Sequence, residues 1–237
     1  MSCYLVSEGQ AATLIDTGYA DAEGDVVEQL RIALPQGAGL TVFLTRAEYE
    51  GIGNVGAVHA AVGIEHLIAG GIANIFDGYA EVAGFTRRWD ERTFVDRVPP
   101  GQSLPVGSSR RLEVLSAPLR ILATFWVFDR VSKTLFTSDA FGHTSLASRE
   151  GSVVIDSVES DASTYESVRE HMLAKFAWLA HGRTQAVSAG LRRVFEERDI
   201  QVIAPMHGCV LSGREVVNRH YELVQAIISE AKPGAES

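Results

Sequence analysis

The segment LTVFLT, at residues 40–45, is the feature that most constrains the fold. A strand that is apolar along its whole length is typical of a sheet covered on both faces. The segment IQVIAP, at residues 200–205, is a second short strand of the same kind. Between them, residues 111–142 hold three predicted strands, and a tight turn at residues 129–133 joins the last two as a hairpin. The sheets therefore cannot be purely parallel.

Predicted helices are mixed with these strands, without strict βαβ alternation. Apolar residues recur at helical spacing in four stretches, and a last helix closes the chain. The predicted helices span residues 24–34, 55–62, 164–179, 187–195 and 215–229. Residues 97–109 hold three of the seven prolines and are predicted to be a surface connection. The whole pattern favours an α/β fold with a two-sheet core and helices on both outer faces, in a single domain over residues 1–237.

Composition excludes several classes of protein. A formal net charge of -9 disfavours nucleic acid as a partner, because a phosphate backbone needs a basic surface. The sequence has no apolar run of about 20 residues, so it predicts no membrane span. The N-terminus lacks the pattern of a secretory signal, and two cysteines, Cys3 and Cys209, do not make a disulfide framework. These features together predict a cytoplasmic protein.

Polar side chains stand where four predicted strands end. They are those of Asp16, the pair Glu48 and Glu50, Asp139, and His207. Side chains at the ends of neighbouring strands converge on one edge of a sheet, although they are distant in sequence. Carboxylates with one imidazole form a hard-metal site, for which iron or manganese is preferred over zinc because oxygen ligands dominate.

The glycines after residue 50 offer a weaker alternative. Gly51, Gly53 and Gly56 have the spacing of a dinucleotide-binding fingerprint, and they follow a strand and open a helix. No acidic strand end follows at the position that would bind the ribose. We therefore rank nucleotide binding below a metal site.

The succession LIDTG, APLRILATFWVFD, LFTSDAFG and IAPMHG resembles the metallo-β-lactamase fold, and within it the diiron domain of the flavodiiron proteins. The resemblance extends from about Cys3 to about His220. It implies an αββα sandwich, and it implies a relationship to enzymes that reduce oxygen or nitric oxide. The flavodoxin domain of that family is missing, so the resemblance implies no flavin in this chain and a separate redox partner for any redox role. It also implies a homodimer.

The first ligand loop of that family carries two histidines and two acids. By this resemblance the first acid is retained as Glu48, and the second is replaced by Glu50, which is longer by one methylene. The first histidine corresponds to Arg46 and the second to Gly51. Neither replacement offers a ligand atom.

The remaining family ligands come from three later segments. The histidine after the APL sequence corresponds to Arg120, whereas the bridging aspartate and the last histidine are retained as Asp139 and His207. Arginine keeps its proton and cannot bind a metal, but it is the natural partner of a carboxylate. We therefore expect an ion cluster of Arg46, Glu48 and Arg120 at the first metal position, and no binuclear iron centre.

The second metal position keeps more of its ligands. Glu50, Asp139 and His207 are enough for one Fe or Mn ion with open coordination positions. In the opposing interpretation, Glu50 faces solvent and His207 only forms a hydrogen bond with Asp139. His143, which follows SDAFG, is expected to line the pocket with Gly51.

Three further histidines are expected on the surface, on or beside outer helices. They are His171, His181 and His220.

Three functions remain open from the sequence. The first is a non-catalytic binding or regulatory protein with a degraded diiron site. The second is a single-metal oxidoreductase acting on oxygen or nitric oxide, or an oxygen-binding protein, that uses Glu50, Asp139 and His207. The third is a metal-independent enzyme that holds an anionic substrate through Arg46 and Arg120.

Overall fold

The structure is a computed structural model that describes residues 1–46, 48–69, 95–96, 98–145 and 151–230. The chain divides into two compact units. Unit 1 comprises Met1–Ser116 and Leu122–Val127, and unit 2 comprises Ala117–Ile121 and Phe128–Ser237. The chain therefore passes from one unit to the other three times. The single domain predicted over residues 1–237 stays a prediction.

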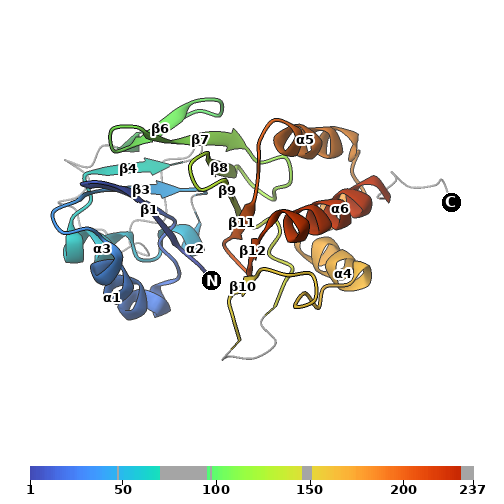
Figure 1. The fold of residues 1–237 in the computed structure, drawn as a ribbon, viewed down its shortest axis with the longest axis horizontal. Coiled ribbons are helices and arrows are strands. Elements are labelled where there is room, and N and C mark those ends of the chain that lie inside the picture. Colours follow the sequence, from blue (N-terminus) through green and yellow to red (C-terminus); the bar gives the residue numbers. More distant parts are fainter. Residues whose placement is uncertain (47, 70–94, 97, 146–150, 231–237) are drawn as a thin grey trace. The chain divides into compact units, whose positions relative to one another are not determined.

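Unit 1 contains a five-stranded sheet in the order β1-β2-β3-β4-β5, of which β1, β3 and β4 are labelled in Figure 1. Its strands are β1 (Tyr4–Glu8), β2 (Ala11–Ile15), β3 (Gly39–Leu44), β4 (His66–Ala69) and β5 (Val95–Asp96). The first two strands form an antiparallel hairpin, whereas β2, β3, β4 and β5 pair in parallel. The sheet is therefore mixed, as the hairpins predict.

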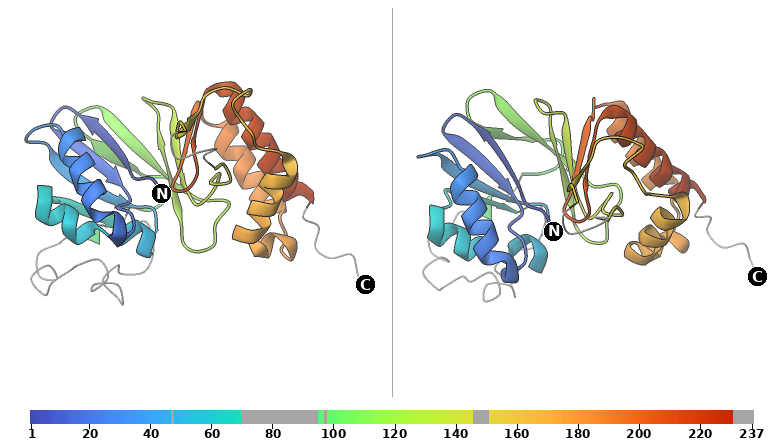
Figure 2. Two further views of the ribbon diagram at one scale, coloured as in Figure 1. Left: turned by 90° about the horizontal axis from the view of Figure 1, so that it is seen from below. Right: turned by 60° about the horizontal axis from the view of Figure 1, so that its bottom comes forward.

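The predicted burial of LTVFLT is confirmed, because the consecutive residues Val42, Phe43 and Leu44 of β3 are all fully buried. Successive residues of a strand point to opposite faces, so both faces of β3 are covered. The helices α1 (Glu23–Ala33) and α3 (Val55–Val62) pack together and contribute Leu30 and Val58 to the core of one face (Figure 2).

The opposite face of this sheet meets a second pair of strands. The strand β6 (Ser103–Val106) contacts β1 and β2, and it pairs in antiparallel with β7 (Arg110–Ser116). The prediction of a surface connection over residues 97–109 is thus wrong for β6, where Leu104 and Val106 are buried. Pro105 is tolerated there because β6 is the last strand of its sheet. Residue 97 lies outside the described residues.

Glu8 joins these two strand pairs of unit 1. Its carboxylate accepts hydrogen bonds from the backbone N–H groups of Ser109 (2.8 Å) and Arg110 (3.1 Å) and from the Ser109 hydroxyl. These bonds, those from Ser109 first, lower the pKa of Glu8 to about 2. The turn of the first hairpin is thereby attached to the turn between β6 and β7.

The strand β8 (Phe125–Asp129) begins in unit 1 and ends in unit 2. Within unit 2 the strand order is β10-β12-β11-β9. These strands are β9 (Thr134–Ser138), β10 (Val154–Ile155), β11 (Val202–Pro205) and β12 (Val210–Ser212). The pairs β9–β11 and β10–β12 are parallel, and β11–β12 is antiparallel, so the second sheet is mixed as well.

Three helices pack beside these strands in unit 2: α4 (Tyr165–Lys175), α5 (Gln185–Glu196) and α6 (Arg214–Glu230). The helix α6 contacts α4, α5, β11 and β12 (Figures 1 and 2). A capping box of Thr164 and Ser167 begins α4. The apolar stripe predicted over residues 164–179 is buried, but α4 ends at Lys175 and a 3-10 helix, η2 (Ala177–Ala180), carries the stripe onward.

No helix in the described part of the chain is both long enough and apolar enough to cross a membrane.

Candidate functional site

The loop after β3 places an arginine against two carboxylates in unit 1. Arg46 is only 2% exposed, and its Nη1 lies 3.2 Å from Oε2 of Glu48. Its Nη2 forms an ion pair with Oε1 of Glu50. The hydroxyl of Tyr19 donates a hydrogen bond of 2.8 Å to the other oxygen of Glu50. Glu50 is 9% exposed, so it does not face solvent.

The turn after β2 holds this loop in place. The backbone N–H and the hydroxyl of Thr17 both donate to the carbonyl oxygen of Gly51, over 2.8 and 2.7 Å. The side-chain amide of the buried Asn54 donates to the carbonyl oxygens of Thr17 and Tyr19, each over 2.8 Å. These bonds fix the short helix α2 (Tyr49–Ile52), and with it the direction of Glu50.

Asp16, the first of the predicted strand-end ligands, supports the same loop. Its Oδ1 accepts from the backbone N–H of Thr45 (2.9 Å), and its Oδ2 accepts from the Thr45 hydroxyl (2.8 Å). Burial, followed by the charge of Asp16, raises the pKa of Cys3 to about 12. Asp16 therefore positions the residue before Arg46, and the nearby thiol stays protonated.

The glycines of the dinucleotide-like spacing serve close packing in unit 1. A Cβ on Gly53 would lie 2.4 Å from the carbonyl oxygen of Gly18 and 2.8 Å from the backbone nitrogen of Ala20. A Cβ on Gly51 would lie 2.8 Å from the carbonyl oxygen of Arg46. Both glycines are thus explained by the approach of neighbouring backbone, without a bound phosphate.

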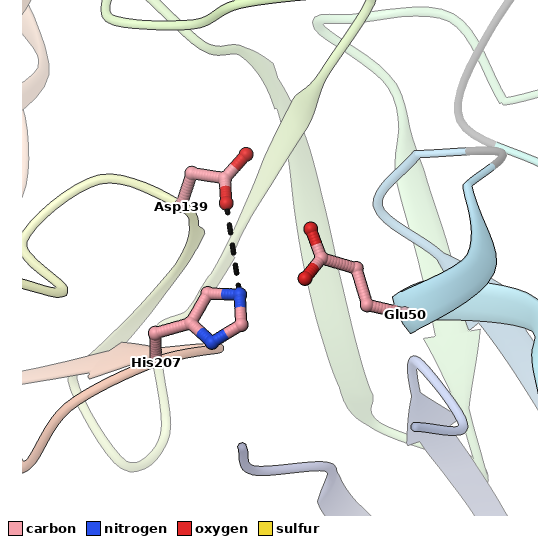
Figure 3. A group of neighbouring side chains, drawn as sticks. All are labelled: Glu50, Asp139 and His207. Atoms are coloured by element: carbon pink, nitrogen blue, oxygen red, sulfur yellow. Dashed lines mark ion pairs between the residues drawn. The ribbon is translucent and has the colours of Figure 1, made fainter. Parts of the chain in front are cut away.

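In unit 2 a lysine lies against the predicted bridging aspartate. Asp139 follows β9 and is 3% exposed, and its Oδ1 lies 2.8 Å from Nζ of Lys175. The Nε2 of His207 lies 3.9 Å from the same oxygen (Figure 3). Lys175 is the last residue of α4, so a helix positions the cation and a strand end positions the anion.

Lys175 and Tyr19 are site residues that the sequence reasoning missed. Lys175 follows the buried Met172 by three residues and precedes the buried Leu179 by four, a spacing that places a charged side chain on the apolar face. That spacing was an available signal for Lys175. For Tyr19 no comparable signal exists, because its contact with Glu50 joins residues 31 apart.

Arg120 belongs to unit 2, where its side chain is exposed and its Nη1 donates to the carbonyl oxygen of Ala117 over 2.6 Å. The predicted cluster of Arg46, Glu48 and Arg120 draws on both units, so it stays a prediction beyond the Arg46–Glu48 pair. The convergence of Glu50 with the residues of unit 2 likewise stays a prediction.

The prediction that His220 lies on the surface is wrong. His220 is fully buried, with its Nδ1 2.8 Å from Nε2 of His143. The cause is that α6 turns this residue inward, toward Asp161, whose Oδ2 lies 3.2 Å from Nε2 of His220. His181 is exposed, as expected, and His171 is partly exposed.

The two mixed sheets with their helices define a metallo-β-lactamase-like αββα fold, and comparison with known structures confirms it. The chain matches the family model described as ODP family beta lactamase over residues 1–208, and it belongs to this family. No curated protein matches the chain.

Three solved structures illustrate the similarity. Rubredoxin oxygen:oxidoreductase from Desulfovibrio gigas is 16% identical, with a TM-score of 0.66, over 97% of this chain and 53% of that chain. A flavo di-iron protein mutant from Thermotoga maritima is 17% identical, with a TM-score of 0.68, over 99% and 54%. The chemotaxis sensor ODP from T. denticola, in its apo state, is 16% identical, with a TM-score of 0.65, over 94% and 85%. The chain thus spans about half the length of the first two.

Proposed function

We propose that the chain is a non-catalytic binding or regulatory member of the ODP family, in which side-chain cations replace the iron ions of the flavodiiron centre. One observation carries the proposal. Each retained carboxylate of the predicted ligand set already contacts a cation of its own unit. Glu48 and Glu50 contact Arg46, and Asp139 contacts Lys175.

The residues present do not fit two iron ions. A guanidinium within about 4 Å of a dication would repel it by several kcal/mol at an effective dielectric constant of about 20. Arg46 is buried beside two of the carboxylates, so turning it out to solvent would remove their cation. Gly51 offers no ligand atom, and backbone lies within 2.8 Å of any Cβ placed there. We therefore derive no reaction step through a diiron centre.

A sensor-type role is supported by the match to the ODP family model, because a solved structure named ODP is that of a chemotaxis sensor. The chemotaxis sensor ODP is matched over 85% of its length, whereas the flavodiiron proteins are matched over about half. A homodimer is part of the proposal by resemblance only, and size-exclusion chromatography with light scattering would test it.

A second candidate is a single Fe or Mn ion held by Glu50, Asp139 and His207, for oxygen binding or oxygen chemistry. The approach of His207 to Asp139 favours it, because an imidazole and a carboxylate oxygen 3.9 Å apart suit a shared ion. The ammonium of Lys175 would have to leave Asp139 first. The third candidate, an anionic substrate on Arg46 and Arg120, has less support, because Glu48 and Glu50 already offset the charge of Arg46.

Metal analysis separates these candidates. The protein should be produced in medium supplemented with iron and manganese, purified without chelators and analysed by inductively coupled plasma mass spectrometry. We expect far less than one metal ion per chain, and no change in His207→Ala. One Fe or Mn ion per chain that is lost in His207→Ala would refute the proposal and establish the second candidate. His181→Ala, an exposed histidine elsewhere, is the matched control.

A further inference from the structure

Unit 2 contains a cavity of about 330 Å³ next to β10. Its wall includes His143, Thr144, Ile155 and Ala162, and it adjoins Asp161. The volume lies at the lower end of the range of about 300–1,000 Å³ that is typical of small-molecule sites. Neither Asp139 nor Lys175 lines it.

The side chains of Asp161, His220 and His143 lie in series beside this cavity, which Asp161 and His143 both border. The carboxylate of Asp161 accepts hydrogen bonds from Nε of Arg219 (2.9 Å) and from the backbone N–H of Ser163 (2.9 Å). His220 places its Nε2 3.2 Å from the same carboxylate. The charge of this carboxylate stabilises the tautomer of His220 that carries its proton on Nε2.

The position of that proton determines which nitrogen of His143 carries a proton. The Nδ1 of His220 has no proton, so it accepts a hydrogen bond from Nε2 of His143 over 2.8 Å. His143 is partly exposed, whereas His220 is fully buried. The other ring nitrogen of His143, Nδ1, therefore carries no proton and can accept a hydrogen bond. His143 also lines the cavity.

Both imidazoles are neutral at pH 7. Burial, and next the neighbouring His220 and His171, lower the pKa of His143 to about 3. Burial also lowers the pKa of His220, although Asp161 partly opposes this. His143 therefore accepts a hydrogen bond without taking up a proton.

The cavity favours neutral molecules over ions. Its described lining contains no lysine or arginine, and its one acidic residue, Asp161, has a fully buried side chain that is paired with Arg219 and His220. An anion would find no cation there, and a cation would find no free carboxylate. The hydroxyl groups of the wall, with Ile155 and Ala162, suit an uncharged molecule that has both polar and apolar parts.

We propose that this cavity binds a small neutral molecule whose hydroxyl or amide N–H group donates a hydrogen bond to His143. His220 and Asp161 are positioning residues that hold His143 in the accepting tautomer. The proposal does not depend on the metal content of the protein.

Three probes of nearly equal shape test the proposal: benzamide, benzoate and benzylammonium, which are neutral, anionic and cationic. Binding to the full chain in EDTA would be measured by ligand-observed NMR. Protein labelled with ¹⁵N in its histidines would report on His143 directly. We expect benzamide to bind more tightly than either ion and to shift the Nδ1 resonance of His143. The substitution His143→Leu should weaken benzamide binding about tenfold, the loss of one hydrogen bond, and His181→Ala should not.

Two results would overturn the proposal. One is that benzoate or benzylammonium binds as tightly as benzamide. The other is that none of the three probes shows binding at the concentrations that ligand-observed NMR can detect. If His143→Leu does not fold, as judged by circular dichroism, the Nδ1 shift in the unsubstituted protein decides. An unchanged Nδ1 resonance in the presence of bound benzamide would refute the role of His143.

Discussion

Replacing Lys175 by Met removes the ammonium group from Asp139 and keeps most of the apolar stem. Asp139 is 3% exposed, so the substitution leaves a buried carboxylate without the cation 2.8 Å away. Breaking a fully buried ion pair costs about 3–5 kcal/mol, and exposed pairs contribute at most about 1 kcal/mol. The Lys175 side chain is 28% exposed. We therefore expect a loss of about 2–3 kcal/mol in the free energy of unfolding, between these two limits.

Urea denaturation, followed by far-UV circular dichroism, measures this loss. With a slope of about 2–3 kcal/mol per M, the midpoint should fall by about 1 M of urea. Lys133→Met is the matched control, because the Nζ of Lys133 lies 2.6 Å from Asp199 and both side chains are more than 40% exposed. Its cost should stay below about 1 kcal/mol.

A second substitution tests the cause of the loss. In the double variant Lys175→Met with Asp139→Asn, the buried charge is gone, so much of the stability should return, and the double-mutant cycle gives the energy of the pair. If Lys175→Met costs no more than Lys133→Met, Lys175 does not neutralise Asp139, and the reasoning about cations in the place of iron fails for unit 2.

Three more predictions follow from named contacts. Arg46→Met should cost about 3 kcal/mol, because it leaves the buried Glu50 without its cation, and Glu50→Gln should restore part of the loss in urea denaturation. Gly51→Ala should cost about 1–3 kcal/mol, because its Cβ would lie 2.8 Å from the carbonyl oxygen of Arg46, whereas Gly24→Ala, with open space around its Cβ, should not destabilise. The low pKa of His143 predicts stability that is fully present above about pH 6.5 and falls by about 1.4 kcal/mol per pH unit toward pH 3, since only the unfolded state binds the proton there. His143→Gln should flatten that slope in denaturation curves recorded at several pH values, and an unchanged slope would exclude His143 as its origin.

Much of the fold could be predicted from the sequence, because its pattern of apolar residues is regular. The uniformly apolar LTVFLT indicates a strand covered on both faces, and Val42 to Leu44 are buried as this requires. The helix predicted over residues 55–62 matches α3, because its limits are marked by Asn54 before it and Gly63 after it. The strand β6 was not predicted, because Pro105 and the flanking glycines are typical of loops. Proline is acceptable in β6 only because this strand lies at the edge of its sheet.

The candidate site could be predicted in part. The resemblance identified Arg46, Glu48 and Glu50 as neighbours, and local sequence spacing is enough to bring them together. Lys175 could not be paired with Asp139 from the sequence, because that contact depends on where the end of α4 meets the residue after β9. His220 was misplaced for a similar reason, since its helix buries one polar residue among apolar ones to reach Asp161.

The interleaved path of the chain has a consequence for the order in which the protein can fold during synthesis. The carbonyl oxygen of Thr45, next to Arg46, accepts its hydrogen bond from the backbone N–H of Phe125, which lies in the second segment of unit 1. About 80 residues separate the two, so at roughly 5–20 residues per second a ribosome needs about 4–16 s to supply the donor. Until then the loop after β3, which carries Arg46, lacks one of its backbone anchors. Arg46 and its two carboxylates are thus present in the nascent chain several seconds before this anchor of their loop is synthesised.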